Sequence, residues 1–355
     1  MTGMTYLRPT GFVDAPFGHD GKVARLAGGL QFFASVEILN AEGGAELVPV
    51  AGIEDRLDEA QQRVWQRLTS PRAPLTLGER VVRLDQPQVV GIVNVTPDSF
   101  SDAGVNADAE TAIAAGHDMA AAGAAIVDVG GESTRPGAKP VWEGDEAARI
   151  LPVIRRLAAA GVAVSVDTRK ALVMEQALAA GAGLVNDVSG LTWDPRALEV
   201  AAKSACPIVL MHHKGQPETM QDDPRYDRPV LLEIYDWLEA RIAACEAAGI
   251  GRDKIVVDPG FGFGKNLQHN LQVMNGLALL HGLGCAVMLG ASRKRTIGAL
   301  AGEAPADRRL PGSLAFALQA AGQGVQLLRV HDVPETVQAL RVWRGLRDAA
   351  LTPPA

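Results

Sequence analysis

From Val89 onward, short apolar runs alternate with stretches rich in alanine and leucine, and this rhythm limits the possible folds more than any other feature. Eight runs have the length and β-branched content of buried strands. They are Val89–Val95, Ala125–Val129, Val162–Asp167, Leu184–Asp187, Pro207–His212, Ile255–Gly260, Ala286–Gly290 and Val325–Asp332. The stretches between them have helical spacing, and several are followed by a glycine, which is typical of a helix end. They include Ala109–Ala122, Glu146–Ala160, Ala171–Ala180, Val230–Ala248 and Leu314–Ala321.

Strands that are apolar throughout are buried on both faces, which favours parallel pairing. Eight strand–helix units in about 260 residues match the size of a (β/α)8 barrel. A doubly wound open sheet is the alternative, but it usually has fewer strands and a glycine-rich loop after the first, where this chain has NVTPDSFSD. We therefore predict an α/β fold, a TIM barrel over residues 86–350.

Residues 1–85 form an N-terminal extension of irregular sequence with no catalytic constellation. Leu30–Leu39 predicts one or two short strands, and Glu54–Leu68 has the apolar spacing of an amphipathic helix. The sequence SPRAP that follows is typical of a linker. We expect the extension to pack against the barrel or a subunit partner, and a separate interaction module is the alternative.

Composition excludes several classes of protein. The net charge of -7 argues against general nucleic-acid binding. Three scattered cysteines are typical of reduced thiols in a cytoplasmic protein. No apolar run reaches the roughly 18 residues that a membrane span needs, so we expect no membrane association.

Polar side chains follow nearly every predicted strand, at its carboxyl end. They include Asn94, Asp167, Asn186, His212, Asp258, Lys294, Arg329 and His331. In a barrel these ends meet on one face, where active sites lie. Asp167 alone could equally cap the next helix, but capping does not account for the whole set.

These residues lie in motifs that resemble those of dihydropteroate synthases. The motifs are VGIVNVTPDSFSDA from Val90, GGESTRPG from Gly130, VSVDT from Val164, Asn186-Asp187, HHKGQPETMQ from His212, DPGFGFGK from Asp258, SRK from Ser292 and RVH from Arg329. The resemblance covers about Val89 to Gly345. It implies a (β/α)8 barrel that joins a pterin diphosphate to 4-aminobenzoate, releases pyrophosphate and serves folate biosynthesis. It also implies a sulfonamide target and a homodimer.

The resemblance implies a pterin site on the strand ends. A carboxylate can accept two adjacent N–H groups of the pterin edge, and Asp258 matches the family residue with that role. Asn186 offers a donor and an acceptor, Asp167 completes the edge, and Lys294 donates from the opposite side. Met211, Phe263 and Gly290 would contact the ring.

The glycines of GFGFGK fit neither a Walker loop nor a dinucleotide fingerprint, because the spacing is wrong. We expect them to permit a close approach of the backbone, with Phe263 beside the substrates.

Cations should meet the pyrophosphate leaving group. Arg329 and His331 alternate along one strand, so they should point the same way. Arg135 would add a third cation, and Asn94 matches the family ligand of Mg²⁺. With Lys294, these three cationic residues are the ones expected to act on the reacting atoms.

Two loops, Thr96–Asn106 and Gly130–Lys139, should close over the reactants and form the aminobenzoate pocket. That pocket would contain Phe100, Thr134, Pro136, Phe263 and Ser292. The chain has Arg295 where the family often has a serine that contacts the aminobenzoate carboxylate. Arg295 either holds that carboxylate or turns to solvent.

The implied mechanism is dissociative: pyrophosphate leaves first, and the aminobenzoate nitrogen attacks the resulting cation. A pterin-binding methyltransferase on the same barrel and a silent pterin-binding paralogue are the alternatives. The motifs NVTPDSFSD, STRPG, SRK and RVH argue against the methyltransferase, and Lys294, Arg329 and His331 argue against the paralogue.

Overall fold

The computed structural model describes residues 6–95, 105–133, 140–215 and 219–352. Eight parallel strands close into a barrel, which confirms the predicted fold. They are β7 (Gln88–Asn94), β8 (Ile126–Gly130), β9 (Val164–Asp167), β10 (Leu184–Asp187), β11 (Ile208–Met211), β12 (Ile255–Asp258), β13 (Ala286–Leu289) and β14 (Leu327–Val330).

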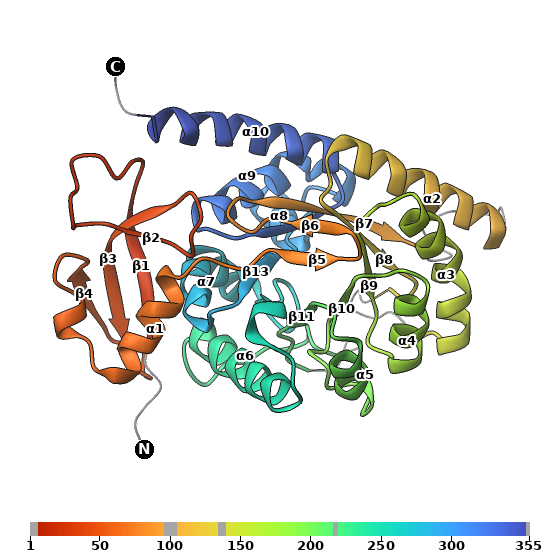
Figure 1. Cartoon of the computed structure of the whole chain (residues 1–355), viewed down its shortest axis with the longest axis horizontal. Helices are drawn as coiled ribbons and strands as arrows, with labels where there is room; N and C mark the ends of the chain where they lie inside the picture. The colour runs from red at the N-terminus through yellow and green to blue at the C-terminus, as the bar shows by residue number, and fades with distance from the viewer. Residues whose placement is uncertain (1–5, 96–104, 134–139, 216–218, 353–355) are drawn as a thin grey trace.

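At least one helix follows each barrel strand and covers the outside of the barrel (Figure 1). The α-helices are α2 (Val105–Ala122), α3 (Glu143–Ala159), α4 (Ala171–Ala179), α5 (Ala197–Ser204), α6 (Val230–Ala247), α7 (Leu267–Asn275), α8 (Arg295–Leu300), α9 (Leu310–Gly322) and α10 (Val333–Ala350). Short 3₁₀ segments are η2 (Arg252–Lys254), η3 (Leu277–Leu283) and η4 (Ala306–Arg308). Helix α9 begins four residues before the predicted start, with Pro311 in its first turn, where the missing N–H of proline costs no hydrogen bond.

Side chains of the barrel strands alternate between two cores because successive residues point to opposite faces. In β12, Ile255 and Val257 pack outward with the helices, whereas Val256 points inward. The inward layer at the amino end of the barrel contains Val90, Ile126, Ala163, Leu184, Val209, Val256, Met288 and Leu327.

A hairpin closes this amino end. It consists of β5 (Leu75–Leu77) and β6 (Arg80–Val82). Leu75, Leu77, Val82 and Leu84 are buried among the inward-pointing strand residues. The hairpin therefore covers the amino end of the barrel, and in this fold ligands bind at the carboxyl ends of the strands.

The extension forms an antiparallel sheet and one helix beside the barrel (Figure 1). Its strands are β1 (Tyr6–Val13), β2 (Ala24–Arg25), β3 (Phe32–Leu39) and β4 (Ala45–Pro49), followed by η1 (Glu54–Arg56) and α1 (Glu59–Thr69). The predicted strand at residues 30–39 and the predicted helix are confirmed, but the sequence did not indicate β1, β2 or β4. Helix α1 starts at a capping box in which the Asp58 side chain accepts from the Gln61 N–H and the Gln61 side chain accepts from the Asp58 N–H.

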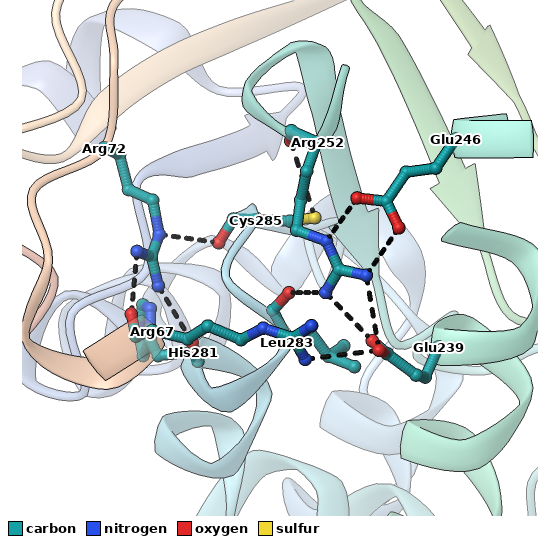
Figure 2. A network of polar contacts seen from close by, with 8 residues as sticks. All are labelled: Arg67, Arg72, Glu239, Glu246, Arg252, His281, Leu283 and Cys285. Atoms are coloured by element: carbon teal, nitrogen blue, oxygen red, sulfur yellow. Dashed lines mark hydrogen bonds and ion pairs between the residues drawn. The ribbon is translucent and has the colours of Figure 1, made fainter. Parts of the chain in front are cut away.

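Arg72 joins the extension to the barrel (Figure 2). Its guanidinium donates to the carbonyls of Arg67 and Ser70 at the end of α1, at 2.8 and 2.9 Å. It also donates to the barrel carbonyls of His281 at 2.8 Å and Cys285 at 2.9 Å. One side chain thus satisfies helix-terminal carbonyls on both sides of the joint.

Within the described ranges, none of the helices has the length and apolar character of a membrane span.

Candidate active site

The candidate site is the next inward layer, two residues further along each strand. From the amino-end layer, a step of two residues leads to side chains at the carboxyl end that face the barrel interior. This layer contains Ile92, Asp128, Ser165, Asn186, Met211, Asp258, Gly290 and Arg329, with Asn94 and Asp167 one further step along. The same alternation therefore places apolar side chains inside the amino end of the barrel and polar side chains inside its carboxyl end.

Arg329 holds two carboxylates together. Its Nε lies 2.6 Å from Asp128 Oδ2, and a terminal nitrogen lies 2.7 Å from Asp167 Oδ2. Asn186 Nδ2 donates to the same Asp128 oxygen at 2.9 Å. The sequence predicted Arg329 as a pyrophosphate ligand; in the structure its guanidinium is paired with Asp128 and Asp167.

Each of these two carboxylates keeps one unsatisfied oxygen. Asp128 Oδ1 and Asp167 Oδ1 are buried and accept no hydrogen bond from the described residues. Buried polar atoms are rarely left without a partner, because desolvation is costly. The two oxygens are therefore positioned to accept N–H groups from a bound molecule.

Burial raises the pKa of Asp167 to about 7; the Arg329 guanidinium opposes this shift and the Asp128 carboxylate adds to it. Burial also raises the pKa of Asp258, although Lys294 opposes the shift. Burial lowers the pKa of Lys294 to about 8. Acids and a base whose pKa values move toward neutrality are typical of functional sites.

Asp258 and Lys294 form the opposite side of the site. Asp258 Oδ1 accepts the Gly260 N–H at 2.7 Å, and Met211 is its neighbour on β11. Lys294 Nζ donates to the Phe261 carbonyl and lies 4.5 Å from the centre of the Phe263 ring. A Cβ on Gly290 would lie 3.8 Å from Arg329 Cβ and 4.0 Å from Asp258 Oδ2, so glycine keeps the space between them open. The predicted pterin residues are thus brought together.

The GFGFGK loop turns where only glycine fits. Gly260 has φ +65°, and a Cβ there would lie 1.7 Å from the His212 carbonyl oxygen. The close approach is therefore to the neighbouring loop of the chain. Lys265 Nζ fixes the loop by donating to the carbonyls of Gly260 at 3.0 Å and Phe263 at 3.1 Å. It also lies 3.0 Å from His212 Nδ1, and burial lowers the pKa of both side chains well below their ordinary values.

Ser292 and His331 lie together at the entrance. His331 Nδ1 is 3.1 Å from Ser292 Oγ, and the His331 N–H donates to the same oxygen at 3.2 Å. The Arg293 guanidinium pairs with Asp332, which orients the turn before Lys294. Arg295 begins α8 and its side chain is exposed to solvent, as in the second of the two predicted alternatives, and its contact with the aminobenzoate carboxylate stays a prediction.

Phe100, Thr134, Arg135 and Pro136 lie outside the described residues. The described residues on either side of the stretch 134–139 contact one another. Glu132, which precedes this stretch, accepts the N–H of Val141, which follows it, at 2.8 Å. Glu132 also pairs with Arg169 at 3.2 Å and with the buried Lys170 at 3.0 Å.

Asn94 is half-buried at the end of β7 and points inward. Across the described ranges, no three His, Cys, Asp or Glu side chains gather as a metal-binding group. Asn94 offers one amide oxygen, a donor that suits Mg²⁺ when phosphate and water supply its other ligands.

The sequence patterns did not indicate a role in or around the site for Asp128, Lys265, Glu132 or Lys170. Asp128 had a detectable signal, because a carboxylate inside the apolar run Ala125–Val129 must have a partner. The other three are recognised only by their contacts across the fold.

Comparison with known proteins gives consistent matches. The family model described as "Pterin binding enzyme" matches residues 90–331. A dihydropteroate synthase of Neisseria meningitidis is 48% identical over 275 residues, which are 76% of this chain and 96% of that protein. The Yersinia pestis dihydropteroate synthase with a sulfonamide drug is 46% identical, with a TM-score of 0.73, 78% of this chain and 99% of that chain covered. The Xanthomonas albilineans enzyme with 4-aminobenzoic acid is 47% identical, also with a TM-score of 0.73, covering 78% and 98%.

The match spans the barrel strands that carry the inward polar layer, and it leaves the extension outside the matched family region. Sequence identities of 46% to 48% indicate a shared family and not only a shared fold. This chain therefore belongs to the dihydropteroate synthases, enzymes of folate biosynthesis.

Proposed function

We propose that the chain joins 7,8-dihydropterin-6-ylmethyl diphosphate to 4-aminobenzoate, with pyrophosphate leaving first. The unsatisfied oxygens of Asp128 and Asp167 carry this proposal. A pterin edge presents adjacent N–H donors, and carboxylate oxygens accept such donors in strong, directional hydrogen bonds. Asn186 adds a polar group beside Asp128, and Asp258, whose charge interacts with that of Lys294, lies on β12, two strands from Asn186 on β10.

The chain stabilises charge as the diphosphate departs. Lys294, Arg329, His331 and Arg135 are the cationic or cationisable groups proposed to meet it. When bound, Mg²⁺ neutralises charge on the leaving diphosphate, and Asn94 would offer it an amide oxygen. Because Arg329 is paired with Asp128 and Asp167, we assign it a second task, which is to hold those carboxylates in place for the pterin.

Aminobenzoate would enter at the open carboxyl face, beside Phe263 and Ser292. We retain Phe100, Thr134 and Pro136 as its other proposed contacts. Its amine is neutral at pH 7, so the chain needs no general base, and catalysis rests on positioning and charge stabilisation. The Yersinia pestis relative is described with a sulfonamide drug, and we propose that sulfonamides compete for this pocket.

We also propose a cytoplasmic homodimer. All three cysteines are unpaired, as expected for a reducing compartment. Val342 and Leu346 on α10 are 64% and 68% exposed, which suits a partner surface. Sedimentation velocity on wild type and on Val342→Asp tests this interface: the proposal expects a dimer that the substitution weakens.

Replacing Asp258 tests the pterin assignment. Asp258→Ala should abolish binding of the dihydropterin diphosphate in calorimetric titration, because an edge donor loses its buried acceptor. Asp118→Ala, an exposed acid on α2, is the matched control and should bind normally. Normal binding by a folded Asp258→Ala protein would show that the edge-recognition argument is wrong.

A further inference from the structure

A cleft of about 380 Å³ lies where the extension meets the barrel. Its walls come from α1, from the segment after α1, and from barrel residues just before β12 and β13. Those barrel residues lie at the amino ends of the strands, whereas the candidate active site lies at the carboxyl ends. The cleft is therefore separate from the catalytic face.

Arginine dominates the lining of this cleft. Arg63, Arg67, Arg72 and Arg252 line it, and Asp253 is the one carboxylate among its lining residues. An excess of guanidinium groups around a concave surface attracts anions.

Acidic residues behind the cleft balance two of the arginines (Figure 2). Arg252 pairs with Glu239 at 3.1 Å and Glu246 at 2.8 Å, and Arg67 pairs with Glu239 at 3.2 Å. Neither Arg63 nor Arg72 pairs with a carboxylate in the described part of the chain. Positive charge in the cleft therefore exceeds what the neighbouring acids neutralise.

Arg72 is a largely buried cation in the wall of the cleft, and it has no carboxylate partner among the described residues. All of its hydrogen bonds within the described residues go to main-chain carbonyls, which carry no net charge. Burial lowers its pKa to about 10, and the Arg67 charge adds to this shift. An anion nearby would supply the missing countercharge.

The exposed wall of the cleft offers further donors. Arg63, Gln66 and Arg67 recur at helical spacing, so they lie on one face of α1, and Ser70 follows directly at its C-cap. Arg63, Gln66 and Ser70 are exposed at its mouth. Guanidinium, amide and hydroxyl donors that converge on one space are suited to the several oxygens of a phosphate group.

We propose that this cleft binds a small phosphate-bearing anion, at a site additional to the pterin and aminobenzoate site. Its volume lies within the usual range of small-molecule sites. One wall is α1, which precedes the matched family region that begins at residue 90. The proposal thus gives the extension a binding role that does not depend on the synthase reaction.

Hydrogen–deuterium exchange of the full-length chain tests the proposal, with inorganic pyrophosphate as the probe. Pyrophosphate should slow amide exchange in residues 63–73 and 281–286, separately from any protection near Arg329. Arg63→Gln and Gln66→Glu should raise the half-maximal pyrophosphate concentration for this protection about fivefold or more. Both side chains are exposed, so these variants should fold.

Arg56→Gln is the matched control. Arg56 is an exposed arginine of the extension that pairs with Glu46 outside the cleft. This variant should respond to pyrophosphate like wild type. Absence of protection in residues 63–73, or equal weakening by all three substitutions, would overturn the proposal, because the second result indicates only general charge attraction.

Discussion

At the scale of single residues, the site depends on carboxylates that are costly to bury. Asp128 and Asp167 share one guanidinium and retain unsatisfied oxygens. Such an arrangement is unfavourable without a ligand, because a buried acceptor loses its water. The pterin would supply the missing donors, so a cost to stability in the free protein becomes affinity for the substrate.

Asp167 makes pterin binding depend on pH. With a pKa of about 7, its ionised fraction rises about tenfold between pH 6 and pH 8. Pterin affinity of the wild type should rise over the same interval, because only the carboxylate accepts two N–H groups. Asp167→Asn should bind more weakly at pH 8 and show a flatter profile in calorimetric titrations. The same ligand is used for both proteins, so its own titration cancels, and parallel profiles would contradict the assignment.

The free protein should show the opposite trend in stability. The folded-state pKa of Asp167 lies above the ordinary value of 3.8, so the folded chain holds a proton that the unfolded chain releases. The contribution of this carboxyl to stability is therefore present below about pH 4 and is lost as the pH rises to about 7. Asp167→Asn should gain in unfolding temperature relative to wild type across that interval.

Asp128 shows what the sequence can and cannot predict about a single site residue. It lies two residues after the inward-pointing Ile126, so the period of a strand places it in the barrel. Its pairing with Arg329, 201 positions away in the chain, follows only from barrel closure. The strand period thus identifies which residues point into the barrel, but it does not identify which of them pair with one another.

At the scale of elements, a buried ion network connects Glu132, which closely follows β8, with α3 and α4. Lys170, at the start of α4, reaches Glu132 and also Glu146 on α3. Burial raises the pKa of Glu132, but the Val141 N–H and the Lys170 ammonium outweigh this and lower it. The network thus joins α3, α4 and both ends of the segment that carries Arg135.

Removing one member of this network should be costly. Lys170→Met leaves the buried Glu146 without its cation and removes one of the two cations that pair with Glu132, so it should lower the free energy of unfolding by about 3 kcal/mol. Chemical denaturation measures the loss. Lys203→Met removes an exposed lysine that pairs with Glu199 and should change stability by less than about 0.5 kcal/mol. Equal effects would contradict the structural role of the network.

The strands of the extension were harder to predict than those of the barrel. Pro9 and Gly11 interrupt β1, so its sequence resembles a loop. The strand is tolerated because it pairs only with β3 and lies at the edge of the sheet, where a missing N–H costs little. The barrel strands contain no proline, and their apolar runs identified all eight.

At the scale of the whole molecule, the extension contacts the barrel at several places, two of which depend on largely buried arginines. Arg72 joins α1 to the end of η3 and to Cys285. Arg347, near the end of α10, donates to Asp14 Oδ1 at 3.0 Å and to the Leu30 carbonyl at 3.1 Å. These contacts support a docked extension, and its division from the barrel near residue 85 remains a prediction.

Loss of the Arg72 joint should loosen the extension. Arg72→Met removes four hydrogen bonds to carbonyls and should lower the free energy of unfolding by about 2 kcal/mol. Proteinase K should then cut between residues 70 and 87 in the variant before it cuts wild type. Arg56→Met, which loses only an exposed ion pair, is the control and should resist like wild type. Rapid release of the extension from wild type would instead indicate a loosely tethered module.

Pyrophosphate release from the purified protein is the most direct test of the proposed synthase reaction. The assay contains the dihydropterin diphosphate, 4-aminobenzoate and Mg²⁺, and each is omitted in turn. Our account predicts release that requires all three, together with formation of 7,8-dihydropteroate. Tight pterin binding without pyrophosphate release would contradict the account, because it would leave the pocket intact but indicate a methyltransferase or a silent pterin-binding protein.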